Sequence, residues 1–92
     1  MGCLCISPSP EQRVLRARSR LWAEMSAAER RLGVQIVAAE IVCKLKFGCY
    51  DAELRYQLGG AARGNVIGIR GAPDELSALA ALCTRVHFAT QL

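Results

Sequence analysis

The alternation of hydrophobic and polar positions predicts a long helix at the start of this chain, followed by strands. Across residues 10–32, apolar side chains recur every three or four positions, which is the spacing of one face of an α-helix. Ser9 and Gln12 stand in the positions of a capping box, and Gly33 follows as a typical helix terminator. We therefore expect one amphipathic helix over residues 10–32.

Residues 34–47 fit two periodicities. Helical spacing is met by Val34, Val37, Ile41 and Leu45. Strand alternation places one set of apolar residues on a core-facing side, namely Ile41, Cys43, Leu45 and Phe47. The content of β-branched residues favours the strand, with a bulge or break near Ala38 and Ala39.

The second half of the chain predicts further strands around one helix. Residues 51–58 alternate polar and apolar at every step, and residues 65–70 form a second β-rich run after a glycine-rich hairpin loop. Residues 71–75 open a helix, and residues 85–92 alternate as a final strand.

The expected order of elements is therefore α-β-β-β-α-β, which is a small α+β domain. We expect one mainly antiparallel sheet of about four strands with helices on one face. The pattern is similar to a ferredoxin-like or ACT-like arrangement, and this analogy concerns the fold alone.

The length predicts a single domain over residues 10–92, preceded by an extended lead over residues 1–9. An alternative interpretation treats residues 1–24 as a dispensable element, because Met25 is followed by its own capping box. Trp22 argues against that alternative, since a large aromatic on an apolar stripe usually packs against something.

Composition favours a cytoplasmic protein. The sequence has five cysteines, an odd number, and no signal peptide or membrane-spanning run, which together indicate free thiols in a reducing compartment. The net charge of +4 permits, but does not require, attraction to an anionic partner.

Reactive side chains form no recognisable catalytic pattern. His87 is the single histidine, and the sequence indicates neither a nucleophile nor an orienting acid beside it. Cys43, Cys49 and Cys83 lack the paired spacing of structural zinc sites. We therefore expect no enzymatic activity, no cofactor and no metal.

The leading functional hypothesis is a small binding or regulatory protein that associates with a protein partner or with a second copy of itself. The long helix carries more apolar length than one sheet face covers, which leaves part of it for a partner. The residues expected at that contact are Val14, Leu15, Leu21 and Trp22.

Two alternatives remain open. Gly2 with Cys3 and Cys5 resembles the start of doubly acylated proteins, although Ile6 stands where that motif has Ser or Thr, so a membrane partner is expected only with acylation. Arg13, Arg16 and Arg20 share one polar helix face, which a weak nucleic-acid binder would use; without an aromatic stacking platform, nucleic acid is not the expected partner.

Overall fold

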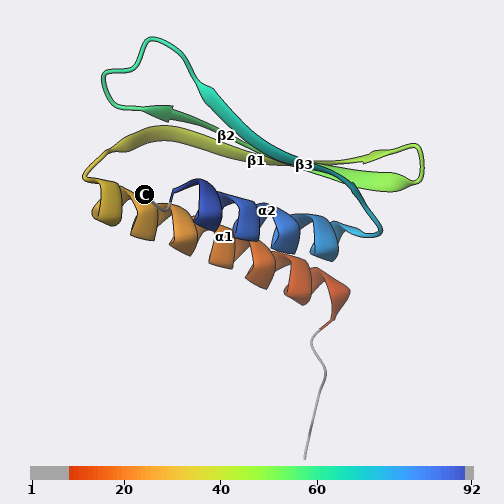
Figure 1. Cartoon of the computed structure of the whole chain (residues 1–92). Helices are drawn as coiled ribbons and strands as arrows, with labels where there is room; N and C mark the ends of the chain where they lie inside the picture. Colours follow the sequence, from red (N-terminus) through yellow and green to blue (C-terminus); the bar gives the residue numbers. More distant parts are fainter. Residues whose placement is uncertain (1–8, 91–92) are drawn as a thin grey trace, which may run out of the picture.

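The computed structural model describes residues 9–90, which form two helices and a three-stranded antiparallel sheet. The elements in chain order are α1 (Pro10–Leu32), β1 (Ile36–Lys46), β2 (Cys49–Leu58), β3 (Asn65–Ala72) and α2 (Glu75–Ala89). Both helices lie on the same face of the sheet (Figure 1). The chain is therefore an α+β protein with a sheet layer and a helix layer.

Helix α1 begins and ends at the residues that the sequence predicts. The Ser9 hydroxyl oxygen accepts from the Gln12 N–H, and the Gln12 side chain accepts from the Ser9 N–H, both over 3.2 Å. Gly33 ends the helix with φ +68°, a left-handed conformation that glycine adopts at little cost, and its N–H donates to the Glu29 carbonyl. The Glu29 carboxylate also accepts from the Ile36 N–H over 2.8 Å, which fixes the start of β1 against α1.

The ambiguous segment after α1 is a strand, as its β-branched content predicts. β1 pairs with β2 along almost its whole length, with a register irregularity between Ile36 and Ala38, close to the expected bulge. Residues 47 and 48 form the tight turn that follows. Phe47 adopts φ +51° there, a conformation in which a bulky side chain is uncommon.

Charged residues cover the face of the sheet that points away from the helices. Across the β1–β2 register, Glu40 stands opposite Arg55 and Lys44 stands opposite Asp51. Glu53, on the same face, accepts from Arg55 over 3.1 Å. Cross-strand pairs of opposite charge stabilise a solvated sheet face, so this side needs no covering layer.

The core lies between the sheet and the two helices. It is built from leucine, alanine, methionine and valine side chains of all layers: Leu21, Met25, Ala52, Leu54, Ala72, Ala78, Leu82 and Val86. The inward residues of β1 that pack against it are Ile36, Ala39, Ile41 and Cys43. Leu45 and Phe47 were expected to face this core, but they lie at the hairpin end and are exposed.

The predicted fourth strand is wrong. Residues 85–89 continue α2, which begins after the N-cap Asp74 and ends at Ala89. Val86 follows Leu82 by four residues and is buried with it, so helical spacing places both side chains in the core. The described residues 9–90 form three strands, and the ferredoxin-like or ACT-like order, which needs the fourth, is not confirmed.

The two helices run parallel to each other. Near their N-terminal ends, Arg18 lies 3.8 Å from the Glu75 carboxylate. At their C-terminal ends, Arg31 donates to the Thr90 hydroxyl oxygen over 2.7 Å. Parallel helices on one sheet face leave a seam between them that opens on the side away from the sheet, and this seam positions one of the candidate sites.

Candidate interaction surfaces

The residues expected to contact a partner separate into two groups in the structure. Leu21 is fully buried in the core, and Val14 is half-buried. Leu15 and Trp22 are exposed, with 43% of the Trp22 surface accessible. Because Leu15 and Trp22 are seven residues apart, two turns of helix, they lie on the same side of α1.

Strand β1 lies beside the C-terminal half of α1 on that side. Trp22 and Glu29 of α1 line a shallow hollow of about 250 Å³ together with Val37, Ala38 and Ala39 of β1. Further exposed apolar residues follow along β1 and its turn. We name as the β1 flank the exposed apolar residues of α1, β1 and the hairpin turn: Leu15, Trp22, Val37, Leu45 and Phe47.

The backbone of β1 adds a second property to this flank. Within residues 9–90 the sheet order is β1-β2-β3, so in this part of the chain β1 and β3 are both edge strands with one row of backbone groups that no other strand pairs. An edge strand is a template for pairing with another strand. The contact expected from the sequence does not include Val37, Leu45 or Phe47, because strand alternation placed Leu45 and Phe47 on the core-facing side.

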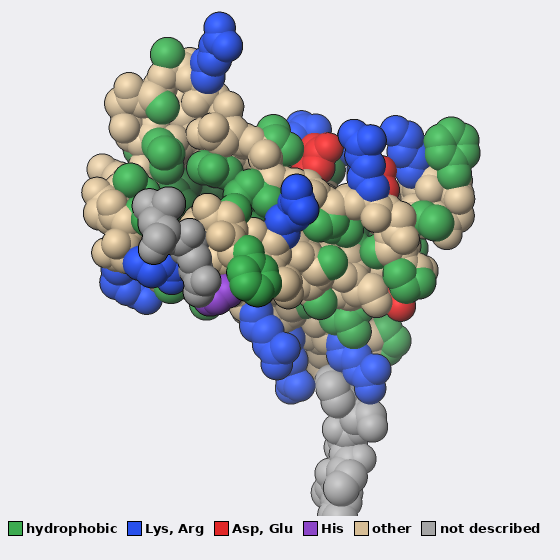
Figure 2. Space-filling model, in the orientation of Figure 1, with side chains coloured by type: hydrophobic (Ala, Val, Ile, Leu, Met, Phe, Trp, Pro, Cys, Tyr) green, Lys and Arg blue, Asp and Glu red, His purple; other side chains and the backbone are tan. Residues whose placement is uncertain are grey.

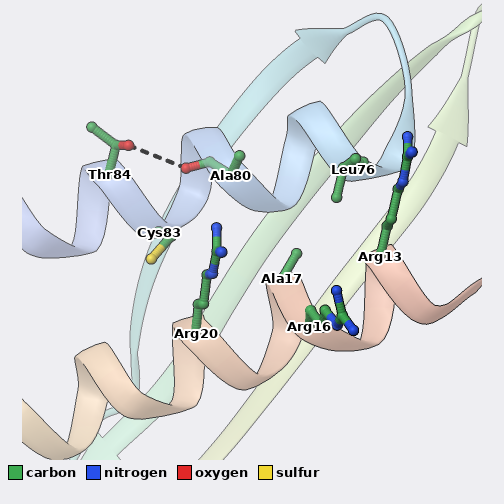
Figure 3. Close-up of a pocket in the computed structure, with 8 residues that line it drawn as sticks. All are labelled: Arg13, Arg16, Ala17, Arg20, Leu76, Ala80, Cys83 and Thr84. Atoms are coloured by element: carbon green, nitrogen blue, oxygen red, sulfur yellow. Dashed lines mark hydrogen bonds between the residues drawn. The ribbon is translucent and has the colours of Figure 1, made fainter. Parts of the chain in front are cut away.

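A groove between α1 and α2 gathers the three arginines that the sequence places on one polar face. Arg13, Arg16 and Arg20 line a groove of about 530 Å³. Figure 3 shows Arg13 and Arg20 extending from α1 toward α2, on either side of Ala17. We call this feature the arginine groove.

The opposite wall of the arginine groove belongs to α2 and is mostly apolar. It consists of Leu76, Ala80, Cys83 and Thr84. Leu76 and Cys83 point from α2 toward α1 (Figure 3), and the Thr84 hydroxyl donates to the Ala80 carbonyl oxygen over 3.2 Å.

Burial raises the pKa of the Cys83 thiol, Glu24 raises it further, and Arg20 opposes both. The thiol is therefore neutral near pH 7, and the charge of the groove comes from arginine.

His87 has an acid beside it that the sequence did not indicate. Its Nδ1 lies 2.8 Å from Oε1 of Glu24, and the Arg31 guanidinium lies 3.9 Å from the same oxygen. These residues join the C-terminal half of α2 to α1, and Arg31 continues the contact to Thr90. Glu24 and His87 are far apart in sequence, so only the packing of α1 against α2 shows that they meet.

The sulfur and histidine ligands considered for zinc do not converge. Cys43 is on β1, Cys49 starts β2, and Cys83 and His87 are on α2. Within residues 9–90, no group of three or more His, Cys, Asp or Glu side chains is placed to hold a metal ion. The three cysteines in this part of the chain are free thiols, and burial raises the pKa of Cys43.

The acylation residues Gly2, Cys3 and Cys5 lie outside the described residues. In the part of the chain that the structure covers, neither helix has the length and apolar content to cross a membrane. Figure 2 shows Lys and Arg side chains over both the helix layer and the sheet on the visible face, where Asp and Glu side chains are few. The arginine groove thus belongs to a broadly basic side of the molecule.

No protein-family model, curated protein or solved structure matches this chain.

Proposed function

We propose that this chain is a non-enzymatic binding protein of the cytoplasm that acts by protein–protein association, and that its β1 flank docks a second copy of the chain. The observation that carries the proposal is the coincidence of exposed apolar side chains with an unpaired strand edge at β1. Burial of apolar side chains away from water lowers the free energy, and an edge strand forms additional backbone hydrogen bonds with a new neighbouring strand.

The charges of β1 are complementary to those of an antiparallel copy. When a two-fold axis passes at Val42, Glu40 of each copy stands opposite Lys44 of the other. Lys44 and Glu40 already face Asp51 and Arg55 of β2. The outer face of the joined sheet would then alternate positive and negative charges from strand to strand, which stabilises cross-strand pairs. Because of the two-fold symmetry, the pair of Glu40 with Lys44 occurs twice between the two copies.

The same register brings apolar residues of the β1 flank together. On the helix side of the joined sheet, Ala39 of each copy stands opposite Leu45 of the other. Val37, at the register irregularity, and Phe47, in the turn, lie at the two ends of this paired stretch. Trp22 lines the same hollow as Ala39, so Leu45 of the second copy would reach its exposed ring. The exposed Leu45 side chain thereby acquires an apolar neighbour, which accounts for its position.

The other edge strand is a poorer template. β3 carries a single charged residue, Arg70, and no acid that could face it in a second copy. A two-fold axis at Gly68 would place Arg70 opposite Val66. Glycine within a strand also weakens pairing, because it has no side chain to pack. The charge pattern therefore favours β1 over β3 as the contact between copies.

Sedimentation velocity from micromolar to millimolar concentration tests this proposal. We expect the mass to rise from that of one chain, 10.0 kDa, to that of two. The emission of Trp22, the only tryptophan, should shift to shorter wavelength over the same range as the ring leaves water. A single-chain mass at every concentration, with constant Trp22 emission, would overturn the proposal.

A further inference from the structure

We propose that the arginine groove binds an acidic amphipathic helix of a protein partner. The groove lies on the opposite side of α1 from the β1 flank, because Arg20 and Trp22 are two residues apart and point in nearly opposite directions on a helix. It is therefore open in one copy or in two. The inference does not depend on self-association.

The groove offers positive charge that no ion pair within residues 9–90 engages. Within residues 9–90, the ion pairs of α1 engage Arg18 and Arg31, whereas Arg13, Arg16 and Arg20 have no acidic partner. The lining includes neither Asp nor Glu. Guanidinium groups bind carboxylates through strong charge-assisted hydrogen bonds, so the α1 wall of the groove, which carries the three arginines, fits an acidic segment.

The apolar residues of the α2 wall are spaced along the chain like the residues with which one helix contacts another. Leu76, Ala80 and Cys83 follow one another by four and three residues, so they form a stripe along two turns of α2, about 10 Å long. Ala17 lies across from them on α1. An amphipathic helix that docks in a groove uses the same spacing for its apolar anchors. One wall thus fits apolar side chains and the other fits carboxylates.

Nucleic acid fits the groove less well. The lining contains no aromatic side chain on which a base could stack. The arginines line one wall only, and the other wall would place phosphates against leucine and alanine. Residues 1–8 of the chain are also poor candidates, because they contain no Asp or Glu.

The test measures binding of a fluorescein-labelled peptide by fluorescence anisotropy with the full chain. The probe has about 16 residues, long enough for partial helix formation, with leucine on one face and glutamate beside it. Two competitors of different chemistry accompany it: the same peptide with lysine in place of glutamate, and single-stranded oligothymidylate. The groove variant combines Arg13→Gln, Arg16→Gln and Arg20→Gln.

A matched control removes three exposed arginines elsewhere: Arg30→Gln, Arg63→Gln and Arg70→Gln. We expect the groove variant to bind the acidic peptide about tenfold more weakly, the combined effect of three exposed ion pairs, and the control to change affinity far less. Ala80→Glu should weaken binding as well, because it adds like charge to the apolar wall.

Three results would overturn the inference: equal weakening in the groove variant and its control, equal affinity for the lysine peptide, or preferential binding of oligothymidylate in the groove. Leu45→Glu, which targets the β1 flank, should leave peptide binding unchanged. That variant therefore separates a failure of the groove inference from a failure of self-association.

Discussion

Replacing Leu21 with alanine is expected to destabilise the protein by about 2–5 kcal/mol, the cost of removing a buried leucine from a core. Leu21 has no exposed surface and packs in the cluster that joins α1 to the sheet and α2. The loss combines the transfer free energy of the side chain with the cavity left behind. In a small domain of modest stability, this leaves a large unfolded fraction at room temperature.

Leu15→Ala is the matched control, because it makes the same chemical change on the same helix at an exposed position. The free energy of unfolding of one copy should change by about 0.5 kcal/mol or less. Urea titrations at low protein concentration, followed by circular dichroism, measure both variants. Equal losses for Leu21→Ala and Leu15→Ala would contradict the assignment of Leu21 to the core and Leu15 to the surface.

Replacing Leu45 with glutamate is expected to raise the dissociation constant between copies by about a hundredfold. Leu45 is 64% exposed, so glutamate is tolerated in a single copy. In the joined sheet the new carboxylate would face Ala39 and the Trp22 ring of the other copy. The two-fold symmetry places the new carboxylate in the contact twice, once from each copy. The free-energy cost of burying it therefore counts twice, and one substitution has a large effect.

Phe88→Glu provides the control for this second prediction. Phe88 is 67% exposed, close to the value for Leu45, and it lies on α2 beside His87 rather than on the β1 flank. Sedimentation of this variant should match that of the natural sequence. If Phe88→Glu separates the copies as fully as Leu45→Glu does, the contact lies elsewhere and the β1 register is wrong.

Local signals in the sequence located most of the elements correctly. Ser9, Gln12 and Gly33 mark the ends of α1 because capping depends on side chains within a few residues of each other. The alternation over residues 51–58 identified β2, since one of its faces packs on the core while the other is charged. These features depend on local chemistry, and the structure confirms them.

The C-terminal strand failed as a prediction for an equally physical reason. Alternation across a few residues around His87 is a weak signal, and it competes with the helical spacing that leads from Leu82 to Val86. Continuing α2 adds a buried valine to a core that already exists. Tertiary burial thus outweighed the preference of valine and threonine for strands.

The candidate surfaces were predicted in part. Sequence periodicity assigned Leu21 and Trp22 to one apolar stripe, but only packing against the sheet and α2 shows which of them is buried. Arg13, Arg16 and Arg20 were placed on one face by helical spacing alone. Their apolar counterpart on α2 depends on how the two helices lie side by side, which the pattern along one helix does not contain.

Amide hydrogen exchange, resolved by residue at low and at high protein concentration, shows whether β1 pairs with a second copy of the chain. If β1 joins a second copy, the β1 amides that point away from β2 become protected as concentration rises, while the outer-edge amides of β3 continue to exchange quickly. If both edge strands exchange at the same rates at every concentration, β1 does not pair with another chain and the proposed association is contradicted.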